Sequence, residues 1–287
     1  MLKQRLITAL VLIPLALYAV FMLPFEWFAG AVVVLMAAGA WEWAPFMGAT
    51  KTVQRLAYVV LIVVLLSTSM VLVPLDVIWQ QGELHPLFST IIMIGCGWWV
   101  LATLLVINYP RSRRIWSRAR AIVGLFGILT LVPAYAGLLA IRSINYAEQP
   151  LNGGFVVLFV LLLVWAADVG AYFAGVRYGR NKLMPAVSPG KTLEGLVGGL
   201  ALAGVVMMVL FHWLRIPAEQ FHGYYITGLF TVVASVFGDL NESMFKRCAG
   251  IKDSGNLLPG HGGILDRIDS LTAALPVFTL CYLWLLV

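Results

Sequence analysis

Where one apolar segment, at about 224–241, gives way to the next, at about 264–287, the chain reads Ser243-Met-Phe-Lys-Arg-Cys-Ala-Gly-Ile-Lys-Asp-Ser-Gly-Asn-Leu-Leu-Pro-Gly-His-Gly-Gly-Ile-Leu-Asp-Arg-Ile-Asp269. We call residues 243–269 the signature stretch. Its glycine turn, at 259–263, lets backbone N–H groups approach an anion. Its basic residues can meet phosphates and its acidic residues can hold a hard cation: Lys246, Arg247, Lys252 and Arg267, and Asp253, Asp266 and Asp269. The stretch therefore predicts phosphate and metal chemistry beside a membrane.

The composition of the whole chain places that stretch in an integral membrane protein. Hydrophobic residues make up 61% and charged residues 11%, against about 45–50% and about 25% in soluble domains. A helical span needs about 20 apolar residues, and nine segments qualify, at about 6–24, 28–47, 56–75, 87–109, 121–142, 154–175, 195–214, 224–241 and 264–287. We predict an all-α polytopic protein of about nine transmembrane helices with a cytoplasm-facing polar cavity.

No linker or repeat divides the chain, so residues 1–287 are expected to form one transmembrane catalytic domain. Its N-terminal spans cover about 6–142, and the half that carries the signature stretch covers about 154–287. The first apolar run, Leu6 to Leu23, lacks a small-x-small cleavage site and is interpreted as a retained span. The cysteines Cys96, Cys248 and Cys281 are too widely spaced to indicate a metal site.

The distribution of basic residues predicts the orientation of the chain. If the N-terminus is cytosolic, 17 of the 19 lysines and arginines fall on cytosolic segments, and only Arg142 and Arg215 fall outside. The positive-inside rule favours this arrangement. We therefore expect a cytoplasmic (inner) membrane protein whose site faces the cytosol. The arginine-rich loop from Arg111 to Arg120 is interpreted as an orientation signal that also attracts anionic lipid, and nucleic acid is excluded as a partner.

Carboxylates in or beside the spans are the next signal, because a charge at the bilayer centre costs about 2.5–3.5 kcal/mol. Six acids share this position and are expected to gather at one cytosolic cavity: Glu42, Asp168, Asp239, Glu242, Asp266 and Asp269. Asp239 and Glu242 are three residues apart, as are Asp266 and Asp269, so each pair shares a helix face. Two helices could present acids to one cation. For Glu42 a structural role and a functional role remain equally open.

The segment Ser188-Pro-Gly-Lys-Thr192 contains the Gly-Lys-Thr that ends a Walker A loop. The comparison fails, because the earlier glycine would stand at Pro185 and no buried strand precedes the loop. A solvated turn with an orienting lysine is the alternative to a phosphate contact.

The signature stretch resembles that of the phosphatidate cytidylyltransferases, which reads Ser-x-apolar-Lys-Arg, four residues, Lys-Asp, and then His-Gly-Gly-x-x-Asp-Arg-x-Asp. Every element is present, and the resemblance extends to Gly238-Asp-Leu-Asn-Glu242 and Ser188–Thr192. It implies that CTP and phosphatidic acid react to give CDP-diacylglycerol and pyrophosphate, with Mg²⁺ required. The number of metals stays open, with a second cation as one alternative, and so does the oligomeric state, with a homodimer as one arrangement.

The resemblance and the residues together give a set of expected site residues. The catalytic residues are expected to be Asp239, Asp266, Lys252 and Asp253, and the metal ligands Asp239, Asp266 and Asp269. Substrate contacts are expected from Ser188, Lys191, Thr192, Lys246, Arg247, His261, Gly262, Gly263 and Arg267. His261 is not needed as a base, because the attacking phosphate is already anionic. It is expected to bond a phosphate oxygen or to fix the glycine turn, unless it is a structural loop histidine.

Two other functions remain open from the sequence. A CTP-dependent lipid kinase of the polyprenol type would transfer the γ-phosphoryl group of CTP instead. A cation- or proton-coupled transporter would also contain acids within its spans. The acids here are expected at one membrane face and not along a continuous path, which favours an enzyme.

Overall fold

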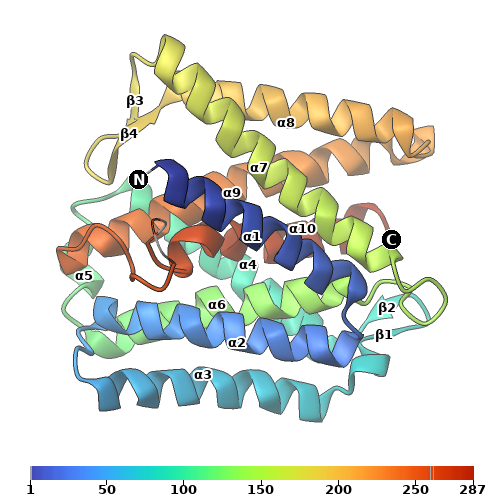
Figure 1. Cartoon of the computed structure of the whole chain (residues 1–287), viewed down its shortest axis with the longest axis horizontal. Coiled ribbons are helices and arrows are strands. Elements are labelled where there is room, and N and C mark those ends of the chain that lie inside the picture. The colour runs from blue at the N-terminus through green and yellow to red at the C-terminus, as the bar shows by residue number, and fades with distance from the viewer. Residues whose placement is uncertain (1, 259, 261) are drawn as a thin grey trace.

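The computed structural model describes residues 2–258, 260 and 262–287. Over these residues the chain is a bundle of long helices (Figure 1). The helices are α1 (Leu2–Met22), α2 (Phe25–Trp43), α3 (Thr52–Leu72), α4 (Pro86–Ile107), α5 (Arg113–Trp116), α6 (Arg120–Arg142), α7 (Asn152–Tyr178), α8 (Leu193–Trp213), α9 (Phe221–Ala249) and α10 (Leu265–Leu285). Short 3₁₀ turns lie at Ala44–Met47, Leu75–Val77 and Ala218–Gln220. Two small hairpins pair β1 (Trp79–Gln80) with β2 (Glu83–Leu84) and β3 (Lys182–Met184) with β4 (Ser188–Thr192), both antiparallel.

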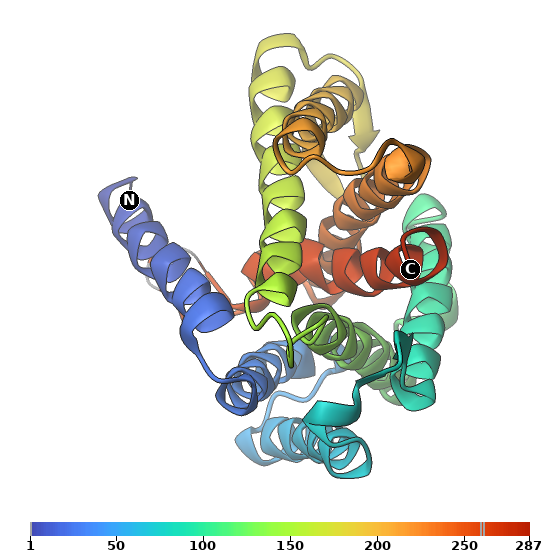
Figure 2. The same cartoon turned by 90° about the vertical axis from the view of Figure 1, so that its right-hand side faces the viewer.

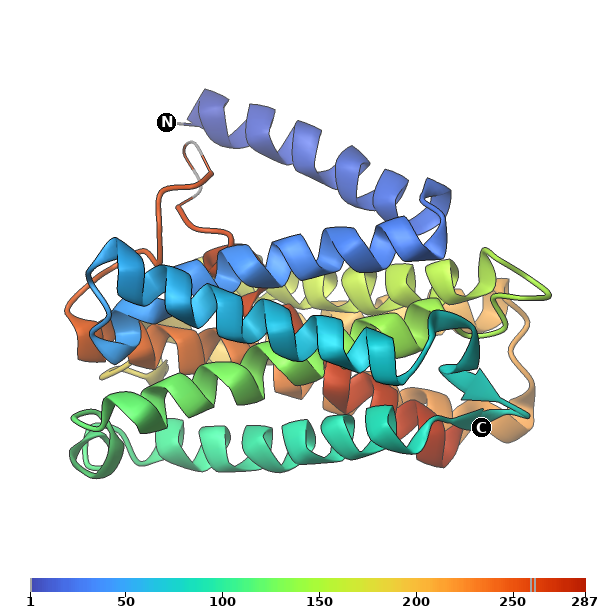
Figure 3. The same cartoon turned by 90° about the horizontal axis from the view of Figure 1, so that it is seen from below.

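The all-α polytopic prediction is confirmed. Within the described residues, eight helices are long and apolar enough to cross a membrane. The helix α1 contributes a shorter apolar segment, Leu10–Met22, so the predicted count of nine spans stays a prediction. Figures 2 and 3 show α1 at the side of the bundle, inclined away from the other helices.

The connections alternate between the two ends of the bundle. Figure 1 shows four connections at one end, namely those after α2, α4, α7 and α9, together with α5 and the β3–β4 hairpin. We call this the polar end, because these connections and the helix turns beside them carry most of the basic residues. The β1–β2 hairpin and the C-terminus lie at the opposite end. This alternation is the parity that the positive-inside argument requires.

The helix α9 corrects one predicted boundary. The sequence predicts a span at about 224–241 followed by a loop, but α9 continues to Ala249 and carries Lys246 and Arg247 on its last turns. Its continuation is stabilised by Phe245, which is buried against Trp43 and Trp116 at ring-centroid distances of 4.8 and 5.0 Å. Burial of such aromatic groups outweighs the polarity of their neighbours. The helix ends at Gly250, whose φ of +72° suits a glycine C-cap.

Close packing joins α7 to α8 at glycines. A Cβ on Gly199 of α8 would collide with the backbone of Ala167, and one on Gly198 would collide with Ala174 of α7. Small residues let helix backbones approach within a membrane. The pair holds the β3–β4 hairpin, which connects the two helices, at the polar end.

Candidate active site

Lys246 links two acids at the centre of the polar end. Its Nζ donates to Glu242 Oε2 at 2.9 Å, one turn earlier on α9, and to Asp266 Oδ1 at 2.6 Å on α10. The side chain of Glu242 is almost fully buried. An ammonium group shared by two carboxylates compensates for their burial. The two helices that the sequence predicts to present acids are therefore joined by a cation from the protein itself.

Asp266 also organises the loop that precedes α10. The backbone N–H groups of Gly263 and Ser254 donate to Asp266 Oδ2 at 2.8 and 3.0 Å. Gly262, which directly precedes Gly263, has a φ of +82°, and a Cβ there would lie 2.9 Å from the same carboxylate oxygen. Only glycine fits such a position without strain. The glycine turn thus serves to seat Asp266 as well as to expose N–H groups.

Glu42 resolves the alternative that its sequence position leaves open, in favour of a positioning role. It is fully buried, and its carboxylate accepts hydrogen bonds from the N–H groups of Ile264 and Leu265, at 3.1 and 2.7 Å. The Ser254 hydroxyl donates to Glu42 Oε2 at 3.2 Å. These N–H groups begin α10, where donors lack intrahelical partners and the helix dipole favours an anion. Glu42, from α2, therefore caps the helix that carries Asp266.

The Ser188–Thr192 segment forms the strand β4 and reaches the same site. The Nζ of Lys191 pairs with Asp239 Oδ2 at 2.9 Å. Thr192 caps α8 by accepting a hydrogen bond from Gly195 N at 3.0 Å. On the other side, Arg247 Nε donates to the carbonyl of Val187 at 3.2 Å. The hairpin is therefore fixed to α9 at two points, and the lysine of Gly-Lys-Thr lies against an acid of the signature region.

The remaining acids complete one electrostatic network. Asp269 on α10 interacts with Asp239 and with Glu242, both on α9. Asp168 on α7 interacts with Asp239, Lys191 and Arg267. All six acids that the sequence places toward one end of the bundle thus lie at the polar end. Five of them belong to this network, and Glu42 binds the loop before α10.

A small cavity is lined by Glu242 and Asp269. Its volume is about 10 Å³, and Asn241 and Trp99 also line it. Within the described part of the chain, Glu242 Oε1 and Asn241 Oδ1 are buried without a hydrogen-bond partner. A space of this size admits about one water molecule. The predicted cytoplasm-facing polar cavity stays a prediction.

The other expected site residues lie around this network or outside the described residues. Lys252 and Asp253 are exposed on the loop after α9, and neither bonds to another described residue. Ser188 lies on β4 beside the network, and Gly262 and Gly263 lie in the turn that seats Asp266. His261 and Pro259 fall outside the described residues.

The carboxylate oxygens at the polar end are of the kind that bind a hard cation, but they do not form a complete coordination shell. The described residues contain no cluster of three or more His, Cys, Asp or Glu side chains gathered as metal ligands. Mg²⁺ commonly uses one or two carboxylates and completes its shell with waters and substrate phosphates. Asp239 and Asp266 supply that kind of donor, each now neutralised by a lysine.

The sequence argument missed the two residues that hold the loop, namely Ser254 and, in its capping role, Glu42. A signal for Glu42 was present, because an acid between Trp41 and Trp43 in an apolar helix requires compensation. Its partners could not be found from spacing, since 212 positions separate it from Ser254.

Comparison with known proteins agrees with the geometry. A family model described as the cytidylyltransferase family matches residues 3–285. The chain is 41% identical over 293 residues to a phosphatidate cytidylyltransferase from Haemophilus influenzae, with 100% of both chains covered. It is 42% identical over 284 residues to one from Pseudomonas aeruginosa, with 99% of this chain and 97% of that protein covered. The chain therefore belongs to the cytidylyltransferase family.

Proposed function

We propose that this protein transfers the cytidylyl group of CTP to phosphatidic acid, giving CDP-diacylglycerol and pyrophosphate in phospholipid biosynthesis. The observation that carries the proposal is the convergence of Lys191, Asp239, Lys246 and Asp266 from β4, α9 and α10 at one end of a membrane bundle. Lysines and acids alternate there, which suits a triphosphate with its cation. The relatives from Haemophilus influenzae and Pseudomonas aeruginosa both carry the name of this activity.

The chemistry is a displacement at phosphorus. A phosphate oxygen of phosphatidic acid forms a bond to the α-phosphorus of CTP, and the bond from that phosphorus to the bridging oxygen of pyrophosphate breaks. The attacking phosphate is already anionic at neutral pH, so no general base is required. Positioning and charge stabilisation supply the catalysis. Lys191, Lys246 and Arg267 are the groups proposed to stabilise the departing pyrophosphate.

We assign the acids to a divalent cation, in keeping with their oxygen donors. Asp239 and Asp266, with Asp269 beside them, would hold Mg²⁺. When bound, this cation neutralises charge on the phosphate oxygens. Release of Lys191 and Lys246 from their carboxylates would free both ammonium groups for the nucleotide phosphates.

The site is proposed to face the cytosol, where CTP is dissolved. The supporting observation is that the basic connections after α2, α4, α7 and α9 lie together at the polar end. Phosphatidic acid would keep its acyl chains in the bilayer and present its headgroup to that end, so the enzyme needs a membrane fold.

The test is the fate of labelled CTP with phosphatidic acid in detergent micelles. Label at the α-phosphorus should appear in the lipid, with release of unlabelled pyrophosphate. Label at the γ-phosphorus should remain in the aqueous pyrophosphate. A lipid kinase would give the opposite pattern, since the γ-label would enter the lipid and CDP would form. Cation flux through proteoliposomes without CTP would instead support the transporter alternative.

A further inference from the structure

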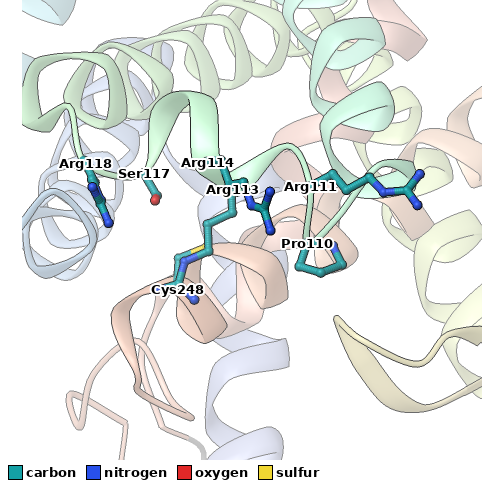
Figure 4. Close-up of a pocket in the computed structure, with 7 residues that line it drawn as sticks. All are labelled: Pro110, Arg111, Arg113, Arg114, Ser117, Arg118 and Cys248. Atoms are coloured by element: carbon teal, nitrogen blue, oxygen red, sulfur yellow. The ribbon is translucent and has the colours of Figure 1, made fainter.

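A second concave feature lies at the polar end, outside the proposed active site. The segment between α4 and α6 forms a pocket of about 660 Å³, lined by Arg111, Arg113, Arg114, Arg118, Ser117 and Cys248. Figure 4 shows Arg111 and Arg118 at opposite ends of the row of basic side chains, with Cys248 of α9 beneath it. Four guanidinium groups around one pocket can bind an anion with several oxygens.

The charge of this pocket is uncompensated by the rest of the protein. No acid is among its lining residues, and within the described residues Arg111, Arg114 and Arg118 form no ion pair. Four neighbouring cations repel one another unless an anion or solvent screens them. Guanidinium groups bind phosphate oxygens in a bidentate geometry that an ammonium group cannot reproduce.

The surroundings favour a lipid phosphate over a free one. The pocket lies between the ends of two apolar helices, α4 and α6. Ile115, within the same short helix α5, is 81% exposed, while its neighbour Trp116 is buried and anchors α5 to the core. An exposed apolar side chain among arginines is typical of a segment at the lipid interface.

The pocket is adjacent to the catalytic network but separate from it. Cys248 lies two positions after Lys246 on α9. Residues two apart on a helix do not share a face, so Lys246 meets the acids while Cys248 meets the arginines. An occupant of the pocket would therefore contact the last turns of α9 without entering the active site.

We propose that this pocket binds the phosphate group of an anionic membrane lipid, at a site distinct from the one that binds phosphatidic acid for reaction. The proposal is independent of the transfer chemistry, because it names a ligand that need not react. Phosphatidylglycerol is the suitable probe, since its phosphodiester carries the charge but lacks the monoester that would be cytidylylated.

Alkylation of Cys248 reports occupancy of the pocket itself. The full-length protein is reconstituted in phosphatidylcholine with or without phosphatidylglycerol and treated with N-ethylmaleimide, a neutral reagent. The rate at Cys248 is followed by peptide mass spectrometry. We expect phosphatidylglycerol to slow alkylation of Cys248 by at least about fivefold, as occupancy of a site with several charge-assisted hydrogen bonds requires. An unchanged rate would overturn the proposal.

Two double variants separate a built site from general surface charge. Arg114→Gln with Arg118→Gln should abolish the protection of Cys248. The matched control, Lys51→Gln with Arg177→Gln, removes two exposed basic residues of other polar-end segments and should keep it. Equal loss in both would show attraction by overall charge only and would overturn the site. Thermal unfolding of each variant in detergent establishes that it is folded.

Two further arms complete the test. Arg114→Lys with Arg118→Lys keeps the charge and any effect on topology. This variant should weaken the protection of Cys248 by at least about threefold, because the bidentate contacts are lost. Full protection would argue against a guanidinium site.

Pyrophosphate added to phosphatidylcholine membranes should leave the rate of alkylation at Cys248 unchanged. Protection by pyrophosphate equal to that by phosphatidylglycerol would assign the pocket to a soluble phosphate and overturn the lipid assignment.

Discussion

At the level of single residues, each of the two acids proposed to hold the metal contacts a lysine. Lys191 pairs with Asp239 and Lys246 with Asp266. The ammonium group beside each partly buried carboxylate compensates for its charge. In the proposed reaction, these acids would exchange a lysine for a metal when the substrate phosphates take up the ammonium groups.

Neutralising either acid should damage turnover far more than folding. We expect Asp239→Asn and Asp266→Asn each to lose at least about two orders of magnitude in kcat, or roughly 2.7 kcal/mol of barrier, because each removes a proposed metal ligand and a carboxylate partner of a lysine. Asp76→Asn, an exposed acid at the other end of the bundle, is the control. Near-normal turnover in either variant at saturating Mg²⁺ would leave Asp269 and Asp253 as the candidate ligands.

Lys252 and Lys191 should behave differently, although the sequence treats both as phosphate contacts. Lys252 is exposed and unattached within the described residues, so Lys252→Ala should raise the KM for CTP by about tenfold, the loss of one charge-assisted contact, with the melting temperature unchanged. Lys191→Ala should lower kcat as well, because Asp239 loses its partner. Steady-state kinetics on both variants measures this, and full activity in both would make the lysines orientation signals only.

The sequence predicts which residues form the site better than how they are paired. The fixed spacing of Asp266 and Asp269 places both on one helix face, as observed. The pairing of Lys246 with Asp266 was not predictable, because it depends on how α9 packs against α10. Hydropathy also predicts that Lys246 lies in a loop, since the polar residues after Asp239 lower the average even though Met244 and Phe245 are buried.

At the level of elements, the start of α10 depends on a carboxylate from α2. Replacing Glu42 with glutamine leaves one acceptor oxygen and turns an amide donor toward N–H groups. We expect Glu42→Gln to lower kcat by at least about tenfold, a loss of about 1.4 kcal/mol, and to speed hydrogen exchange in residues 250–264. Mass spectrometry of exchanged peptides measures the second effect.

The matched control for that variant is Glu26→Gln, which changes an exposed acid at the other end of the same helix. It should leave both kcat and exchange unchanged. Exchange in Glu42→Gln equal to that of the unchanged protein would show that the cap does not hold the loop.

Helix boundaries illustrate how far hydropathy can predict an element. The span expected at 121–142 is observed as Arg120–Arg142, because its apolar residues are continuous. The span expected at 224–241 continues instead to Ala249. What extends it is tertiary packing of Leu240, Met244 and Phe245 in the core, which a window average over the sequence does not register.

At the level of the whole molecule, one of the two basic residues outside the polar end has a structural explanation. Arg142 is only 1% exposed, and it donates to the carbonyls of Val20 and Pro150 at 2.6 and 2.9 Å. It thereby ties the end of α1 to the connection between α6 and α7. We expect Arg142→Met to destabilise the protein by about 1–3 kcal/mol, since the carbonyl of the buried Val20 loses its donor and the contact with Pro150 is lost as well.

Thermal unfolding in detergent measures this loss, with Arg215→Met as the comparison. Arg215 is exposed and is the other basic residue outside the predicted cytosolic segments. Its removal should leave the melting temperature unchanged. An equal shift in both variants would indicate a general effect of charge and not the contacts of Arg142.

The orientation of the bundle can be tested with reporter fusions. We expect the N-terminus and the connections at 111–120, 177–194 and 250–262 to lie in the cytosol, with the C-terminus outside, because these segments share the polar end and its basic residues. Alternate sidedness of successive connections would agree with Figure 1. A cytosolic C-terminus would contradict this orientation, whereas an N-terminus outside, with these connections still cytosolic, would show that α1 does not cross the membrane, so that the count of spans is eight.

The length of α9 determines the depth in the membrane at which its acidic residues would lie. Its 29 residues span about 43 Å, roughly 13 Å more than the hydrocarbon layer. The charged residues of α9 lie in its final third, so the extra length of about 13 Å is expected to extend beyond the hydrocarbon layer at that end. Asp239 lies ten positions before the end, about 15 Å along the axis, so in a helix perpendicular to the membrane it would lie near the edge of the hydrocarbon layer. In the proposed reaction, the length of α9 would therefore hold Asp239 at the boundary between the acyl chains and the headgroups, so the nucleotide would have to approach that boundary while phosphatidic acid stays in the bilayer.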